Sequence, residues 1–192
     1  MRLLILILIL MFSFQSWSKA DDIRDYEIEG IGIGDSLLDH MSIQQFNISK
    51  KREYKYVHTF ATITVKNKNL NLYDAVRAYY KIKDKNKIIH AVEGTTFISN
   101  MSECNNLMDK VANEIDETYK NLKSDKDTFN HWADKSNKSK VHQIDYEFNS
   151  GDVIAVQCVD WTKKITDENG WKDSFRVTLF DKETAEFLRS LN

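Results

Sequence analysis

The chain has 192 residues, no proline and a formal net charge of −2, from 27 Lys and Arg against 29 Asp and Glu. Acidic and basic side chains are mixed along its whole length, whereas nucleic-acid binding depends on a clustered basic surface. The composition therefore argues against a nucleic-acid partner and predicts a solvated surface of mixed charge.

The amino terminus is typical of a cleavable secretory signal peptide covering residues 1–20. Arg2 supplies a positive charge, and residues 3–14 are apolar with one exception. A helix that crosses a membrane needs about 20 apolar residues, so we expect no stable membrane span after cleavage. Ser18 and Ala20 are the small residues that signal peptidase prefers. We therefore predict cleavage after Ala20 and a periplasmic or secreted protein.

The mature chain, residues 21–192, is predicted to form a single domain, because 172 residues suit one hydrophobic core. In its first half, apolar and polar residues alternate at period two between polar turns, which is typical of antiparallel strands. A short helix is expected at residues 36–41, with Asp35 or Ser36 as its cap. The strands predicted in this half are residues 25–33, 53–65, 72–82 and 88–98.

The most regular helical pattern covers residues 102–122, where apolar side chains recur at steps of four and three. Asn100 and Glu103 resemble a capping box at its start. Asp181 is expected to cap a closing helix. The predicted class is α+β, a mostly antiparallel sheet with one long amphipathic helix and two short helices packed on one face. The strands predicted in this second half are residues 142–148, 153–161 and 174–180.

The two cysteines, Cys104 and Cys158, are predicted to form a disulfide. An exported protein meets an oxidising environment, and an even number of cysteines is then first interpreted as paired. Cys104 lies on the apolar stripe of the predicted helix and Cys158 in an apolar strand, so both should face one core. Two buried free thiols or a metal pair are the alternatives. Zinc needs more ligands than two cysteines supply, so we predict no metal site and no cofactor.

The tetrapeptide beginning at Gly34, Gly-Asp-Ser-Leu, is similar to the opening motif of the GDSL esterases and lipases. In that family the serine is the nucleophile, which here implies Ser36. Such chemistry also needs a histidine base and an aspartate to orient it, which the family supplies as Asp-x-x-His near the carboxyl end. No histidine of this chain follows an aspartate at that spacing, and the Asn-Asp pair of the family is missing. A serine hydrolase is kept as the alternative function.

A wider resemblance covers nearly all of the mature chain. The segments at residues 28–39, 133–140, 150–154 and 167–171 resemble small exported proteins of marine alphaproteobacteria. That group has no assigned activity, so the resemblance implies export and a bacterial source and gives no residue a role.

Residues 123–140 are polar and irregular, and a long irregular segment in a compact domain is either functional or disordered. If the domain has a binding site, we expect it here, with His131, Trp132 and Asp134 as its binding residues. The favoured interpretation of the aromatic side chains is that they only pack this segment onto the sheet. The predicted function is a non-catalytic binding or interaction domain of the cell envelope, with a protein or small-molecule partner.

Overall fold

The computed structural model describes residues 22–50, 54–56, 59–65, 70–120 and 122–190. The predicted signal peptide and its cleavage site lie outside these residues. Within them, no helix combines the length and the apolar character needed to cross a membrane.

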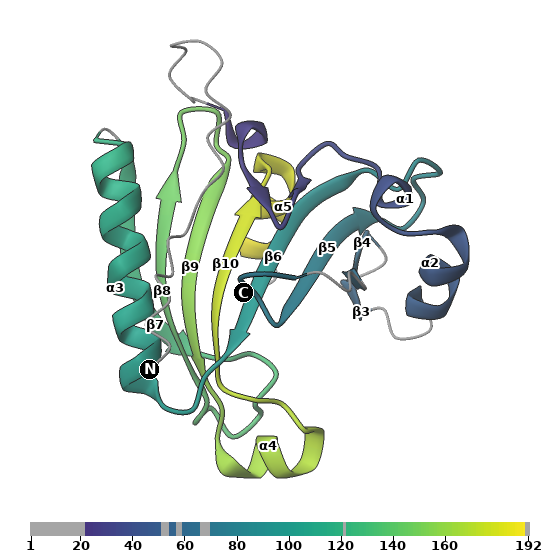
Figure 1. The fold of residues 1–192 in the computed structure, drawn as a ribbon. Coiled ribbons are helices and arrows are strands. Elements are labelled where there is room, and N and C mark those ends of the chain that lie inside the picture. The colour runs from purple at the N-terminus through teal and green to yellow at the C-terminus, as the bar shows by residue number, and fades with distance from the viewer. Residues whose placement is uncertain (1–21, 51–53, 57–58, 66–69, 121, 191–192) are drawn as a thin grey trace.

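The fold is built on one antiparallel sheet of eight strands (Figure 1) in the order β3-β4-β5-β6-β10-β9-β8-β7. Neighbouring strands of the sheet are consecutive in the sequence except for β6 and β10, because β10 is inserted between β6 and β9. Together with the helices, this confirms the predicted α+β class. The strands are β3 (Tyr54–Tyr56), β4 (Phe60–Val65), β5 (Ala75–Lys81), β6 (Ile89–Phe97), β7 (Lys123–Asn130), β8 (Lys140–Glu147), β9 (Val153–Asp160) and β10 (Ser174–Phe180).

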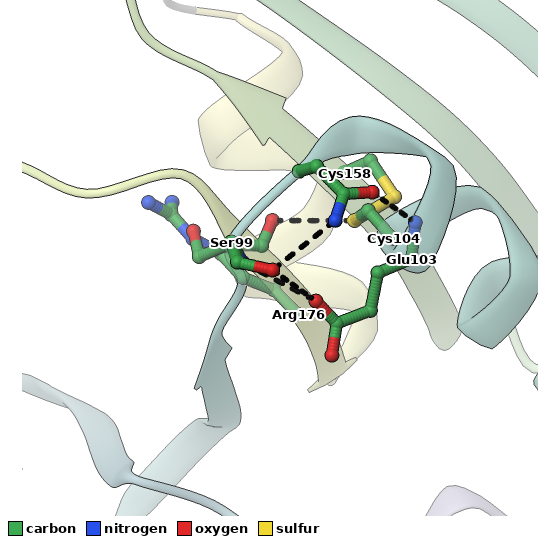
Figure 2. Close-up of a disulfide and its surroundings, with 7 residues drawn as sticks. Ser99, Glu103, Cys104, Cys158 and Arg176 are labelled. Carbon is green, nitrogen blue, oxygen red and sulfur yellow. Dashed lines mark hydrogen bonds between the residues drawn. A yellow bond between two sulfur atoms is a disulfide. The ribbon is translucent and has the colours of Figure 1, made fainter.

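The long helix predicted from periodicity is α3, Met101–Thr118. Its cap is the expected one, because Asn100 Oδ1 accepts a hydrogen bond from Glu103 N at 2.9 Å. The Glu103 carboxylate in turn accepts from Ser99 Oγ at 2.9 Å (Figure 2). The shorter helices are α1 (Leu37–His40), α2 (Ile43–Lys50), α4 (Lys163–Asn169) and α5 (Lys182–Arg189). Of these, α1 and α5 were predicted, with Ser36 and Asp181 as their caps.

One face of the sheet packs against α3 and holds most of the core. Cys104 in the first turn of α3 is bonded to Cys158 in β9, with Cα atoms 5.9 Å apart, which confirms the predicted disulfide (Figure 2). Both cysteines are fully buried. The amino-terminal elements pack on the same face, where the ring of Phe46 in α2 contacts Tyr80 in β5 at 5.7 Å.

The opposite face carries two helices, so the expectation that all helices pack on one face is wrong. Phe187 of α5 contacts Phe60 of β4, with ring centroids 5.1 Å apart. At the other end, Ile165 of α4 packs with Val141 and Val159 in a second small core. Because every strand alternates its side chains, apolar residues at the ends of this face need these two covers.

Two predicted strands near the amino terminus are divided in the structure. Residues 25–33 form a hairpin of β1 (Glu27–Ile28) and β2 (Ile31–Gly32). Glu29 and Gly30, between them, both have positive φ, as a two-residue hairpin turn requires. Residues 53–65 likewise contain a pair of antiparallel strands, β3 and β4. Alternation alone does not show where a strand folds back.

The prediction of an irregular segment at residues 123–140 is wrong for its first half, which is the edge strand β7. Its side chains are exposed on both faces, so β7 lacks the apolar alternation that marks a half-buried strand. Its Lys and Asp residues suit an edge, since charges there discourage pairing with another chain.

The helix α4 was also missed, although its sequence carries two end signals. Thr162 accepts a hydrogen bond from Ile165 N at its start, and Gly170 ends it in the left-handed conformation, with φ of 70°. These are common capping residues at the two ends of a helix. A helix of two turns is too short for apolar periodicity to reveal it.

Candidate functional site

The face of the sheet opposite α3 carries a continuous set of polar side chains between α4 and α5, here called the polar strip. Two adjacent cross-strand rows form it. One row passes from Gln143 through Gln157 and Arg176 to Thr95. The next passes from Asp145 through Ala155, Thr178 and Glu93 to Arg77. The polar strip is therefore defined by its side chains Gln143, Gln157, Arg176, Thr95, Asp145, Thr178, Glu93 and Arg77.

A buried carboxylate lies at one end of the polar strip. Glu93 is 3% exposed, and its Oε1 accepts from Arg77 Nη2 at 2.6 Å and from Thr95 Oγ1 at 2.8 Å. Burial raises the pKa of Glu93, but the positive charges of Arg77 and Arg176 outweigh burial and hold its pKa below the usual range. Glu93 is therefore ionised at neutral pH and holds Arg77 through a charge-assisted hydrogen bond, while Arg176 Nε donates to Ser174 Oγ at 3.0 Å.

The other end of the polar strip is a chain of amides. Gln157 Nε2 donates to Gln143 Oε1, and Gln143 Nε2 donates to Asp145 Oδ1 at 2.8 Å. Burial raises the pKa of Asp145, and Arg189 of α5 lies 4.0 Å from its carboxylate. This chain orients both amides, so their remaining donors and acceptors have fixed directions.

Aromatic side chains border the polar strip on the side of α4. Within the described residues, three large aromatic side chains are exposed, and all three lie here: Phe97, Trp132 and Trp171, at 46%, 51% and 40%. We call these three the aromatic border. Between the two indoles lie His131 and Trp161, whose rings are 4.2 Å apart. Trp171 continues the row at 4.7 Å from Trp161, and Trp132 lies 5.6 Å from His131.

His131 is the link between the aromatic border and the polar strip. Its Nδ1 accepts from Ala133 N at 3.2 Å, which places the ring proton on Nε2. Burial, together with the positive charges of Arg176 and Arg77, lowers the pKa of His131 to about 4 against the opposing effect of Asp134. The imidazole is therefore neutral at physiological pH and presents a donor.

Asp134 has a different position from the other two predicted binding residues. It is buried, and its carboxylate accepts four hydrogen bonds, from the N and Oγ atoms of Ser136 and Ser139. These bonds hold its pKa far below the usual range. The turn that they form follows Trp132 directly, so Asp134 positions His131 and Trp132 from inside the loop. All three residues remain predictions as binding residues.

Several residues of this site were not predicted: Arg77, Glu93, Gln143, Gln157, Arg176 and Trp171. All of these residues except Trp171 lie in strands. Because side chains alternate along a strand, their side chains point to the face opposite α3. A glutamate and arginines inside otherwise apolar strands were a usable signal, because charged residues are seldom buried unless paired. The partners themselves could not be read from the sequence, since they come from different strands.

Ser36, the nucleophile of the alternative function, has two hydrogen bonds, both with backbone atoms. Its Oγ donates to Asn86 O at 2.8 Å and accepts from Leu38 N at 3.2 Å. The neighbouring histidine, His40, is engaged by Asp35, with Nε2 and Oδ2 2.8 Å apart. Ser36 is thus the cap of α1, as expected for a serine before a helix.

Comparison with known proteins gives no relative: no family model, no curated protein and no solved structure matches the chain. Across the described ranges, no three or more His, Cys, Asp or Glu side chains are grouped so as to hold a metal ion.

Proposed function

We propose that this chain is an exported, non-catalytic binding domain whose ligand surface is the polar strip together with the aromatic border. One observation carries the proposal: the three exposed large aromatic side chains of the described residues all lie beside one row of fixed polar groups. A few convergent polar groups beside apolar and aromatic side chains are the usual composition of a ligand site.

The exposed indoles keep apolar surface in contact with water, and a ligand that covers them removes this unfavourable contact. Apolar surface that is covered contributes roughly 25 cal/mol per Å², and a tryptophan offers a large area of this kind. The side chains of Trp132 and Trp171 leave much of this area exposed to water. A ligand that covers both indoles gains this free energy, while the polar strip orients it through hydrogen bonds.

The site is tested by the response of the mature protein to an extract of the envelope of the producing cell. In an NMR titration of the 15N-labelled protein, we expect amide shifts at the aromatic border and polar strip. The variant Trp132→Ala/Trp171→Ala should lose them. Ile43→Ala/Ile48→Ala is the matched control, because both isoleucines are 57% exposed and lie on α2, which packs on the opposite face. Shifts confined to the α3 face would contradict the proposal.

Export is the second part of the proposal, and residues 1–21 lie outside the described residues. The buried disulfide supports it, because such bonds persist in oxidising compartments. Mass spectrometry of the protein recovered from the periplasm or medium should show an amino terminus at Asp21. Recovery of an intact Met1 in the membrane fraction would contradict cleavage.

A further inference from the structure

Resting on the proposed function of this surface, we propose that its ligand is an uncharged oligosaccharide. The sugar rings lie on the indoles of Trp132 and Trp171, and their hydroxyl groups bind the amides, carboxylates and guanidinium groups of the polar strip. Three properties of the surface favour this class of ligand: its charge, its hydrogen-bonding groups and its aromatic rings.

The face is close to electrically neutral, which favours an uncharged ligand. In and beside the polar strip, four basic side chains lie near five carboxylates: Lys123, Arg77, Arg176 and Arg189 near Asp125, Asp127, Glu93, Asp145 and Glu147. A polyanionic ligand requires a surplus of basic groups, whose counterions are released on binding. An anionic membrane surface requires the same surplus. Neither surplus is present here.

The hydrogen-bonding groups suit hydroxyls, each of which both donates and accepts. The polar strip offers amide oxygens, guanidinium donors and a carboxylate side by side, all held by one another.

The aromatic rings are arranged for a ligand of more than one sugar unit. Trp132, His131, Trp161 and Trp171 follow one another as a row, and the exposed indoles are at its two ends. The apolar C–H face of a pyranose ring covers an indole face as other flat or apolar groups do. Two separated indoles therefore favour a chain of sugars over a single sugar.

A protein partner fits this surface less well. Glutamate and aspartate are depleted in protein interfaces, whereas the polar strip contains Glu93 and Asp145. Covering such groups with a second protein removes water without replacing all of its hydrogen bonds, and this is unfavourable. A flexible polyhydroxyl ligand replaces the water with hydroxyl groups of similar hydrogen-bonding capacity.

Chemical or enzymatic treatment of the envelope extract before the NMR titration distinguishes a sugar ligand from a protein ligand. Periodate cleaves vicinal diols and so destroys most sugars, whereas proteinase K destroys proteins. We expect periodate to abolish the amide shifts at the aromatic border and proteinase K to leave them unchanged. Shifts that survive periodate but disappear after proteinase K would overturn the oligosaccharide and leave the proposed function intact. An untreated extract that produces no shifts would overturn both.

Defined ligands give the affinity. Calorimetry of the disulfide-intact mature protein with neutral tetrasaccharides of 1,4-linked glucose and of 1,4-linked mannose, both sensitive to periodate, should show saturable binding for at least one of them. Trp171→Ala and Gln157→Ala should each weaken that binding about tenfold, which corresponds to about 1.4 kcal/mol. Ile43→Ala/Ile48→Ala should bind as the wild type does. Equal weakening by the control, or no effect of Trp171→Ala, would count against this surface as the sugar site.

Discussion

Replacing both disulfide cysteines with alanine is expected to lower the free energy of unfolding by about 4 kcal/mol. The bond joins Cys104 at the start of α3 to Cys158 in β9 across a sequence separation of 54 residues. Closing a loop of this length restricts the unfolded chain, and loss of the bond restores that freedom. Urea unfolding of the wild type and of Cys104→Ala/Cys158→Ala, with and without dithiothreitol, measures the difference.

The reductant serves as the internal control for this prediction. Dithiothreitol should destabilise the wild type and leave Cys104→Ala/Cys158→Ala unchanged, because that variant has no bond to reduce. A wild type that unfolds at the same urea concentration in both conditions would show that the bond contributes nothing to stability. The buried position of both cysteines adds a small packing loss to the double variant alone.

Replacing Glu93 with alanine is expected to lower the free energy of unfolding by about 3 kcal/mol at neutral pH. Removal of one partner of a buried ion pair leaves the other charge without compensation. We expect the lower end of the usual range, because the Arg77 side chain is 35% exposed and water can solvate part of its charge. Denaturant unfolding measures the loss, and Glu168→Gln is the matched control.

The control carboxylate is exposed and makes a weaker ion pair than Glu93 does. Glu168 lies on α4 with a side chain that is 57% exposed, 3.8 Å from Lys164. Exposed pairs of this kind contribute roughly 0.3–0.5 kcal/mol, so Glu168→Gln should have little effect. If Glu93→Ala destabilised the protein no more than this control, the ion pair with Arg77 would not be a stabilising element of the sheet.

The same pair predicts a pH dependence of stability. The pKa of Glu93 is lower in the folded protein than in the unfolded chain, where a glutamate has a pKa of about 4.3. The stabilisation is therefore complete above that pH and is lost as the pH falls through the folded pKa. Glu93→Gln should remove this contribution and make the unfolding free energy less dependent on pH below about 4.

The elements that were predicted correctly are those whose sequence contains the whole signal. The predicted strand at residues 174–180 coincides with β10 because its alternation is continuous and Asp181 then caps α5. The helix α3 was found because its apolar stripe extends over several turns. In both cases the pattern repeats along the chain, so no information from another strand is needed.

One error arose because the deciding contact lies in another strand. The strand β7 exists because its backbone pairs with β8, although its side chains show no apolar periodicity. Asp134 remains a predicted binding residue, and in the structure both of its oxygens accept hydrogen bonds from Ser136 and Ser139, two and five residues further along the chain. A polar residue in a loop looks the same in the sequence whether its groups are occupied or available.

By itself, the sequence determined the class of fold, the long helix, the main caps and the pair of cysteines, because these depend on local periodicity and on composition. Only the tertiary structure decided which polar residues meet. Strand register places Arg77 opposite Glu93 and Arg176 opposite Gln157, and it places Trp161 against His131. The physical reason is that the partner of a strand residue is set by pairing between distant segments, and a shift of one residue would turn each side chain to the other face.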